Sequence, residues 1–307
     1  MKSIRHLLSL NDLSSEELLH LIDYAIELKA LHARGDDPQV FAGKVVGLVF
    51  EKASTRTRVS FEAGVYHLGG NAIVVSSQGS QIARGEPTED TATVMGRYCD
   101  LLMVRTFGQD IVESYARYSG VPVINGLTDL AHPCQLLADL MTCKERGLDL
   151  AKMQVAWIGD GNNMANSWIA AAGLLGFSLK LAVPTGHDPD QGFLKLARER
   201  GNECIEIGAD PSWAATKAQV VTTDVWASMG QEQEAAKRRE VFAGFSITTE
   251  LMSHAAPQAT VLHCLPAHRG EEISDEIMRA HPEIYDQAEN RLHAQKALMA
   301  WLMEQAE

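Results

Sequence analysis

Cysteine is scarce in this sequence, and long hydrophobic runs are absent. The five cysteines among the 307 residues stand apart and form no CxxC pair. This spacing argues against a disulfide framework, and no second ligand pair stands at metal spacing, so we expect no bound metal. No apolar run is long enough to span a bilayer, and the first residues lack the pattern of a signal peptide. We therefore expect a cytoplasmic protein with reduced thiols and no membrane partner.

Basic residues are also few relative to acidic ones. Lys and Arg together number 27 against 40 for Asp and Glu, which gives a net charge of −13. This balance argues against a nucleic acid as the main partner. A site for an anionic ligand in so acidic a chain would have to be a local concentration of cationic side chains.

The sequence does contain a regular alternation of strand-like and helical segments. A first helix is expected after Ser14, which forms a capping box with Glu17. Strand-like runs follow at 45–50, 72–75, 101–104 and 121–124, with helical stretches at 89–98, 111–118 and 135–146. After Gly147 the alternation resets, with strands at 155–158, 179–183, 204–207, 220–223 and 261–263 and a last helical segment at 282–307. The pattern predicts an α/β fold of two doubly wound parallel-sheet domains joined by interdomain helices.

The stretch 45–70 carries a strong functional signal. An apolar run of strand type leads into Ser54-Thr55-Arg56-Thr57-Arg58, and apolar residues at helical spacing follow. The hydroxyls and both guanidiniums therefore stand on the first turn of a helix, where free N–H groups and the helix dipole favour an anion. We expect a phosphate pocket at this turn. The alternative is that Ser54 is an ordinary cap and that the arginines pair with Glu51 or Glu62 on the surface.

A glycine-containing turn, Gly159-Asp160-Gly161-Asn162-Asn163, follows another predicted strand and opens a helix. It resembles a dinucleotide fingerprint, but the third glycine is missing and no acid ends the next strand. A nicotinamide enzyme is therefore the weaker interpretation. The turn could present Asn162 or Asn163 to a ligand, or the asparagines could simply cap the helix.

Three more polar segments stand at comparable places: His132-Pro133-Cys134-Gln135 before a helix, 224–230 after a strand, and 263–269 after another. Asp224 at a strand end could hold an ammonium group or could only form a turn. His263 and Cys264 are adjacent and would point to opposite sides of a strand, which argues against zinc. Because ligands of open α/β sheets bind at the carboxyl ends of strands, we expect these segments to contribute to a common function.

In this order, the motifs 54–58, 132–135 and 263–266 resemble those of the aspartate/ornithine carbamoyltransferase family. Segments 224–230 and 263–270 are similar to the ornithine branch of that family, and the resemblance covers nearly the whole chain. It implies a carbamoyl-phosphate-binding domain, residues 1–138, with a C-terminal helix, residues 289–307, that crosses back to it. Residues 139–288 would form the L-ornithine-binding domain.

The resemblance also implies roles for individual residues. Carbamoyl phosphate would be bound by Ser54, Thr55, Arg56, Thr57, Gln81, Arg105, His132, Gln135, Cys264, Leu265 and Arg291. L-ornithine would be bound by Asn163, Asp224, Ser228 and Met229, and the catalytic residues would be Arg105, His132, Asp224, Cys264 and Arg291. Gln81 matches a loop that reaches a neighbouring subunit's site, so we expect a homo-oligomer, specifically a trimer with shared active sites. No cofactor is implied.

The implied reaction moves the carbamoyl group of carbamoyl phosphate to the side-chain amine of L-ornithine and yields L-citrulline and phosphate. Of its two metabolic uses we favour arginine biosynthesis over catabolism. The charge of Asp224 disfavours L-aspartate as the acceptor, whereas N-acylornithine and putrescine remain alternatives, and Asp224 could contact either amino group of ornithine. A rival of another class is a non-catalytic phosphate or nucleotide binder, but such a binder would not need the amine-site residues Asp224 and Cys264.

Overall fold

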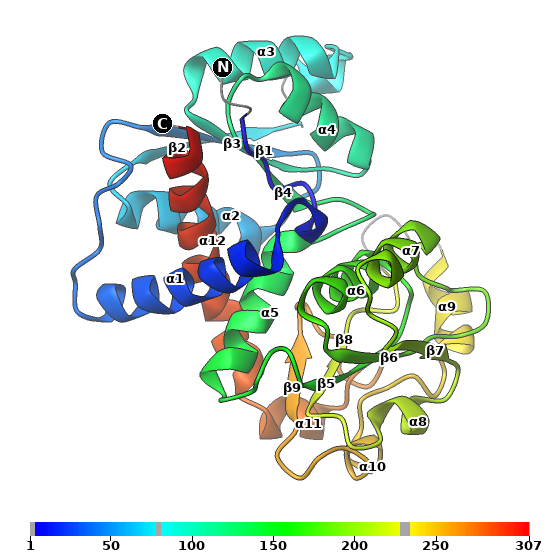
Figure 1. Cartoon of the computed structure of the whole chain (residues 1–307). Helices are drawn as coiled ribbons and strands as arrows, with labels where there is room; N and C mark the ends of the chain where they lie inside the picture. The colour runs from blue at the N-terminus through cyan, green and yellow to red at the C-terminus, as the bar shows by residue number, and fades with distance from the viewer. Residues whose placement is uncertain (1–3, 78–80, 228–233, 307) are drawn as a thin grey trace. The chain divides into compact units, whose positions relative to one another are not determined.

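The computed structural model describes residues 4–77, 81–227 and 234–306 of the chain. The chain divides into two compact units, one made of Met1–Met141 with Asn290–Glu307 and the other of Thr142–Glu289. Both divisions fall inside helices, α5 (Pro133–Glu145) and α12 (Glu283–Ala306), which Figure 1 labels. The domain boundaries implied by the family resemblance, 138/139 and 288/289, fall in the same two helices.

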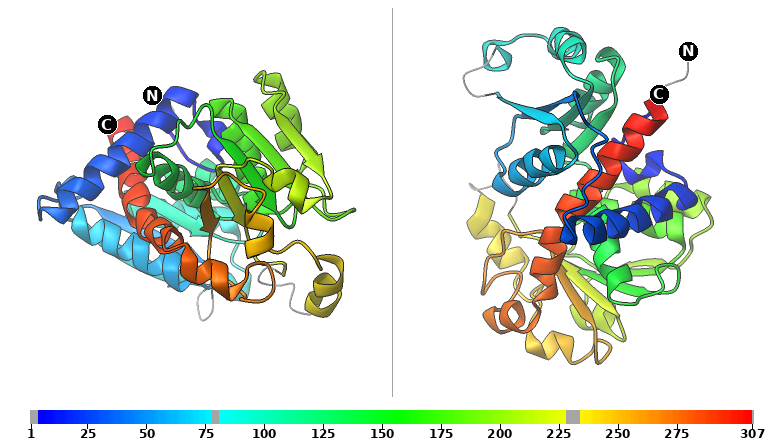
Figure 2. Two further views of the ribbon diagram at one scale, coloured as in Figure 1. Left: turned by 90° about the horizontal axis from the view of Figure 1, so that it is seen from below. Right: turned by 90° about the vertical axis from the view of Figure 1, so that its left-hand side faces the viewer.

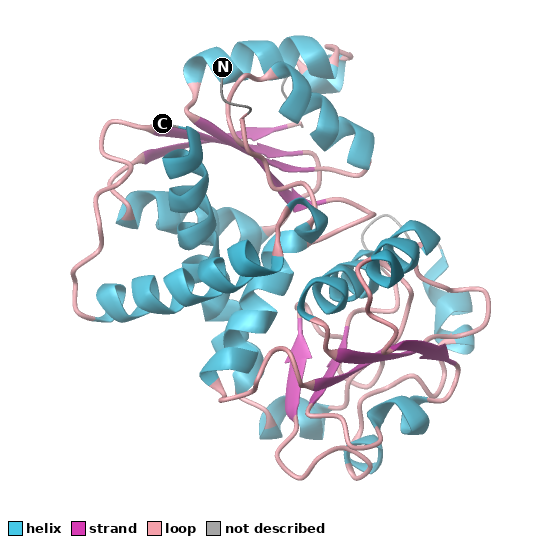
Figure 3. Cartoon of the chain, in the orientation of Figure 1, coloured by secondary structure: helices cyan, strands magenta, loops and turns pink. Residues whose placement is uncertain are grey.

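The first unit is built on a four-stranded parallel sheet in the order β2-β1-β3-β4. The strands are β1 (Val45–Phe50), β2 (Asn71–Ser76), β3 (Leu101–Arg105) and β4 (Val123–Leu127). The other elements are η1 (Leu10–Asp12), α1 (Ser15–Ala33), α2 (Thr55–His67), η2 (Ile82–Arg84), α3 (Thr88–Tyr98) and α4 (Gln109–Tyr118), with α5 and α12 as above. Helices α3 and α4 cover one face of the sheet, and α1, α2 and α12 lie on the other (Figure 3).

The second unit is built on a five-stranded parallel sheet in the order β7-β6-β5-β8-β9. Its strands are β5 (Gln154–Ile158), β6 (Ser178–Ala182), β7 (Ile205–Gly208), β8 (Val220–Thr223) and β9 (Thr260–His263). Its helices are α6 (Asn163–Leu175), α7 (Gln191–Glu199), α8 (Pro211–Ala215), α9 (Ala235–Val241), α10 (Thr249–Met252) and α11 (Asp275–Ala280). An apolar core that includes Ile158, Val221, Phe242 and Val261 packs between the sheet and its helices.

The α/β class and the alternation of elements predicted from the sequence are confirmed. The capping box is also present, because the Ser14 side chain accepts from the Glu17 N–H and the Glu17 side chain accepts from the Ser14 N–H. The predicted strand at 121–124 is displaced, and β4 begins at Val123. Pro122 has no N–H to give to a ladder, although its carbonyl still accepts from Leu102. None of the described helices is both long and apolar enough to cross a membrane.

The two ends of the chain meet in the first unit, where α1 and α12 lie side by side (Figure 2). Lys29 of α1 donates to the Asn290 side chain of α12 at 2.7 Å, and the Arg5 guanidinium lies 5.4 Å from the centre of the Trp301 ring. Lys296 of α12 is wholly buried and forms an ion pair with Asp37. Since an unpaired buried ammonium is costly, the Asp37 carboxylate is needed for α12 to pack here.

A cluster of imidazoles surrounds this ion pair. His32 bonds to Asp37 at 2.6 Å and stacks on His67 with ring centres 4.3 Å apart, and the His293 ring lies 5.6 Å from His32. Burial, reinforced by the charges of Lys296, Lys29 and His32 and opposed by Asp37, lowers the pKa of His293 to about 3. His293 is therefore neutral in the folded protein at any pH at which the fold is expected to persist.

This burial predicts a pH dependence of stability. The unfolded chain takes up a proton at His293 near pH 6.5 whereas the folded chain does not until about pH 3, so the stabilisation is complete above pH 6.5 and is lost as the pH falls. We expect His293→Gln to reduce the slope of unfolding free energy against pH, between pH 6.5 and 4.5, by up to about 1.4 kcal/mol per pH unit. Urea unfolding at several pH values measures the slope. His20→Gln, at an exposed position of α1, should leave it unchanged, and an unchanged slope in the His293 variant would contradict the assignment.

Candidate functional site

The polar motifs of each unit stand at the carboxyl ends of three adjacent strands. In the first unit Ser54 follows β1, Arg105 ends β3 and His132 follows β4, and in the second unit Asn162 follows β5, Asp224 follows β8 and Cys264 follows β9. In the first sheet the chain runs outward from β1 to β2 on one side and from β3 to β4 on the other, so the switch point lies between β1 and β3. In the second sheet the switch point lies between β5 and β8 for the same reason. Ligands of doubly wound sheets bind at such a switch point.

The first turn of α2 has the predicted geometry. Ser54 is the N-cap, with an extended backbone, and its Oγ accepts from the Thr57 N–H at 3.2 Å. The same hydroxyl lies 3.0 Å from Thr57 Oγ1. Thr55, the first residue of the helix, is exposed. The first turn of the helix contains no acidic residue, and a helix N-terminus without a negative side chain favours a bound anion.

Thr57 is the point at which distant arginines converge. Its side chain is fully buried, and its Oγ1 accepts from Arg291 of α12 at 2.8 Å and from Arg105 of β3 at 3.5 Å. Arg105 and Arg291 are themselves 8% and 3% exposed. Two nearly desolvated guanidiniums therefore lie beside a helix N-terminus, and this local positive charge is what an anion site in an acidic chain requires.

The two arginines of the α2 turn behave differently. Arg58 is exposed and pairs with Glu62 at 3.3 Å, so for this residue the surface alternative is the one observed. Arg56 is half-buried, and its Nε atom is buried with no hydrogen-bond partner among the described residues. Glu51, the other carboxylate considered for these arginines, instead accepts from Thr106. Of the two, Arg56 is the one available to a ligand.

His132 lies close enough to the buried arginines for their charges to act on it. Burial, together with the charges of Arg291 and Arg105, holds the pKa of His132 well below its usual 6.5. The imidazole is therefore neutral at physiological pH and can give one N–H to a ligand without carrying charge. Burial also raises the pKa of the neighbouring Cys134 thiol to about 12, and this thiol donates to the Asn125 carbonyl, which fits a packing role.

Gln135 is oriented by a residue that sequence reasoning missed. On α5 its Nε2 donates to Asp139 Oδ1 at 3.0 Å, one helical turn on. This contact identifies the Nε2 and Oε1 ends of the amide, because a carboxylate can accept only from the NH₂ group. The Gln135 Oε1 atom is consequently left buried with no hydrogen-bond partner among the described residues, and it can accept from a ligand N–H.

In the second unit the central group is Asp224, which is 8% exposed. Its Oδ2 accepts from Asn162 Nδ2 at 3.0 Å, and its Oδ1 accepts from the Cys264 thiol at 2.9 Å. Asn162 also caps α6, since its Oδ1 accepts from the N–H groups of Met164 and Ala165. Asn162 thus caps the helix, as one interpretation of the sequence expects, and it also orients Asp224, which neither interpretation includes. Asn163, the position predicted to contact ornithine, is nearly buried in the first turn of α6.

The expectation that His263 and Cys264 point to opposite sides of a strand is wrong. Ligand atoms of Asp224, His263 and Cys264 lie within 4.8 Å of one another, because β9 ends at His263 and the chain turns at Cys264. The imidazole is nevertheless engaged at both nitrogens: Nδ1 accepts from the Leu265 N–H at 2.9 Å, and Nε2 contacts Glu272 at 3.0 Å. A metal at this place would have to displace one of these bonds, so the donor set does not favour one.

The remaining predicted positions lie outside these two groups. Gln81 is exposed and directly precedes η2, and no contact to the α2 turn is found for it among the described residues. Leu265 has a positive φ of 56° and its N–H is held by His263. Ser228 and Met229 lie outside the described residues.

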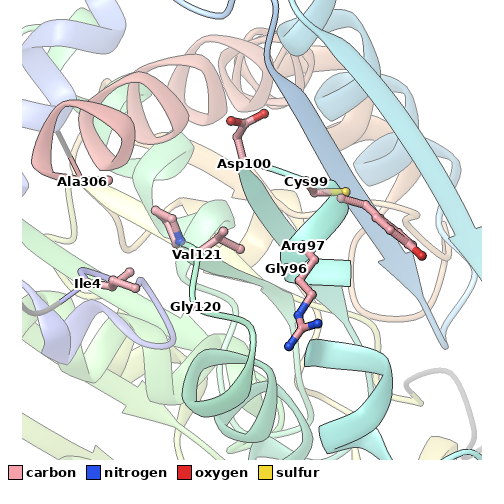
Figure 4. Close-up of a pocket in the computed structure, with 10 residues that line it drawn as sticks. Ile4, Gly96, Arg97, Cys99, Asp100, Gly120, Val121 and Ala306 are labelled. Carbon is pink, nitrogen blue, oxygen red and sulfur yellow. The ribbon is translucent and has the colours of Figure 1, made fainter. Parts of the chain in front are cut away.

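A surface hollow of about 470 Å³ lies at the other edge of the first sheet (Figure 4). Its lining includes Asp100 and Val121, which precede β3 and β4, and Ala306 at the end of α12. The Asp100 carboxylate already accepts from the Val45 N–H and pairs with Lys44. The hollow contains none of the motif residues, and it faces the amino ends of the strands, whereas ligands of such sheets bind at the carboxyl ends.

Comparison with known proteins agrees with this geometry. The family description "Aspartate/ornithine carbamoyltransferase, carbamoyl-P binding domain" matches residues 5–145, and "Aspartate/ornithine carbamoyltransferase, Asp/Orn binding domain" matches residues 151–302. The ornithine carbamoyltransferase of Geobacter sulfurreducens is 54% identical over 301 residues, which is 98% of this chain and 99% of that protein. That of Pelobacter propionicus is 52% identical over 300 residues, 97% of this chain and 98% of the relative.

Solved structures show the same fold. The ornithine carbamoyltransferase of Pyrococcus furiosus has a TM-score of 0.93 and 44% identity, with 99% of each chain covered. The anabolic enzyme of Campylobacter jejuni has a TM-score of 0.94 and 41% identity, covering 98% of this chain and 100% of that one. The chain therefore belongs to the aspartate/ornithine carbamoyltransferase family.

Proposed function

We propose that the protein transfers the carbamoyl group of carbamoyl phosphate to the side-chain amine of L-ornithine, giving L-citrulline and phosphate, and that it does so in the cytoplasm for arginine biosynthesis. The observation that carries the proposal is the convergence of Ser54, Arg105 and Arg291 on Thr57 at the N-terminus of α2. The biosynthetic direction is supported by the likeness to the anabolic enzyme of Campylobacter jejuni.

At the carbamoyl end, the phosphate would be bound by the free N–H groups of α2 with Ser54, Thr55 and Thr57, and by Arg56. Arg105 and Arg291 would face the negative charge that develops on the carbonyl oxygen and on the departing phosphate. A neutral His132 would donate to the same carbonyl oxygen, and Gln135 Oε1 would accept from the carbamoyl NH₂ group. Thr57, Arg105, Arg291 and Gln135 are held by hydrogen bonds within the protein, and such preorganisation is the condition for efficient electrostatic stabilisation.

At the amine end, Asp224 and the Cys264 thiol would orient the nucleophile together with Asn163, Ser228 and Met229, whereas Leu265 would complete the carbamoyl end. The free amine has a pKa of about 10.4 and is protonated at neutral pH, whereas attack requires its neutral form. Attack on the carbonyl carbon forms the C–N bond, the C–O bond to phosphate breaks, and the amine proton leaves with the phosphate or solvent. The acidic side chain Asp224 suits a cationic acceptor and disfavours L-aspartate.

The first prediction separates the two arginines of the α2 turn. We expect Arg56→Ala to lower kcat/KM for carbamoyl phosphate by about 10²- to 10³-fold, because it removes a charge that faces the phosphate. Arg58→Ala is the matched control: its exposed pair with Glu62 contributes about 0.2–1 kcal/mol at most, so turnover should stay within about twofold. A steady-state citrulline assay measures both. Equal turnover in the two variants would reject the phosphate pocket.

The second prediction concerns the acceptor. With carbamoyl phosphate saturating, we expect ureido product from L-ornithine in strong preference to N-acetylornithine, putrescine and L-aspartate. Each acceptor differs in charge or length, so that their order reports on the pocket around Asp224. A preference for putrescine or the acetylated amine would retain the mechanism and overturn the substrate. No ureido product with any of the amines, from a folded protein, would instead support the non-catalytic phosphate binder.

The third prediction concerns assembly. We propose a homotrimer in which Gln81 reaches a neighbouring subunit's site, and we expect light scattering to give three times the chain mass of 33.5 kDa. Mixed trimers made by co-refolding Gln81→Ala with Arg56→Ala should recover activity that neither parent has, because some sites would then combine an intact residue from each chain. A monomeric mass, or no recovery on mixing, would rule out shared sites.

A further inference from the structure

The turn that follows β9 has an unusual backbone. Leu265 adopts a φ of +56°, in the left-handed region that side chains other than glycine rarely enter. This turn carries Cys264, whose thiol donates to Asp224. A residue held in such a conformation must be fixed by its surroundings, so the groups that fix Leu265 also determine where Cys264 lies.

The Leu265 N–H is held by His263 Nδ1 at 2.9 Å. Because Nδ1 accepts this hydrogen bond it carries no proton, and the imidazole proton must be on Nε2. Nε2 lies 3.0 Å from Glu272 Oε1 and donates to it. His263 and Glu272 are both fully buried, so that water cannot replace either partner.

Glu272 makes its contacts to this loop. Its Oε1 accepts from His263 and from the His268 N–H, and its Oε2 is buried without a hydrogen-bond partner among the described residues. The adjacent Glu271 is different: it is partly exposed and pairs with Arg239 at 2.8 Å. Burying a carboxyl group completely costs free energy. At Glu272 the buried group accepts from His263 Nε2 and thereby fixes the tautomer of that histidine.

We propose that Glu272 is a positioning residue for carbamoyl transfer. Acting through His263, it leaves Nδ1 free to hold the Leu265 N–H, and the turn then keeps the Cys264 thiol on Asp224. The inference rests on the proposed function, in which Cys264 and Asp224 orient the amine. It assigns to Glu272 a role that none of the motif residues fills.

Three variants test the role of the acceptor oxygen. Glu272→Gln keeps an oxygen that can accept from Nε2 and should retain most of the turnover, whereas Glu272→Met keeps the length without the acceptor. A displacement of about 1 Å at a reacting group costs about 10²-fold, so we expect a loss of that order in kcat for Glu272→Met. Glu271→Met is the matched control and should behave as wild type. Binding of inorganic phosphate, measured by calorimetry, should not change in any variant because the α2 turn belongs to the other unit.

A double-mutant cycle tests the route through His263. His263→Asn can place an oxygen near the Nδ1 position for the Leu265 N–H but cannot reach Glu272. Adding Glu272→Met to His263→Asn should therefore cost little further activity. Additive losses, or an equal loss in Glu272→Gln and Glu272→Met, would overturn the tautomer mechanism. Activity losses that only follow a lower folded fraction, monitored by circular dichroism, would assign Glu272 a purely structural role.

A measurement that does not need turnover separates this inference from the proposed function. We expect alkylation of Cys264 by iodoacetamide, followed by peptide mass spectrometry, to speed up several-fold in Glu272→Met and not in Glu272→Gln, because the thiol is no longer held on Asp224. The exposed Cys204 in the same protein is the internal reference. An inactive wild type would overturn the proposed function alone, whereas unchanged labelling in a folded Glu272→Met protein would overturn the positioning role.

Discussion

The first unit depends on keeping positive charge in a place from which water is largely excluded. Arg105 and Arg291 come from β3 and α12, and both reach the Thr57 hydroxyl beside the N-terminus of α2. Guanidiniums near a helix N-terminus oppose the helix dipole and cost about 0.3–1 kcal/mol each. The fold accepts this cost by pinning α12 through Lys296–Asp37 and Lys29–Asn290. The proposed phosphate ligand would relieve this repulsion when it binds at the turn.

Burial explains why the titratable groups near these arginines are neutral. Burial, and then the charges of Arg291 and Arg105, lower the pKa of His132, so the neutral imidazole can direct an N–H to a ligand without adding charge. Three of the proposed ligand contacts also have a partner that fixes their orientation: Asp139 for Gln135, Asn162 for Asp224, and Glu272 for the turn that carries Cys264. Low dielectric makes each of these bonds stronger, and it makes the loss of one partner correspondingly costly.

Local patterns were enough to predict the elements and the motif positions. The strand–turn–helix at 45–67 could be read directly, because an apolar run, a Ser cap and helical spacing all agree. The start of β4 was missed because apolar residues surround Pro122, whose missing N–H outweighs them. The sequence could not tell that Arg58 pairs with Glu62 while Arg56 Nε has no partner among the described residues. This difference depends on the directions of the two side chains around one helical turn. Asp139 could have been found from its i, i+4 spacing to Gln135, whereas Glu272 and Arg291 are placed only by tertiary structure.

The acidity of the chain acts in opposite directions on the two proposed substrates. A net charge of −13 attracts a cationic amine and repels a phosphate, but the screening length is about 8 Å at physiological ionic strength. Within the site, charges a few ångströms away therefore outweigh distant surface carboxylates. The proposed phosphate ligand would need fixed cations at contact distance, and the buried arginines and the α2 N-terminus would provide them. For the amine, the nearby Asp224 carboxylate would matter more than the acidic surface, because the surface charges are screened over about 8 Å.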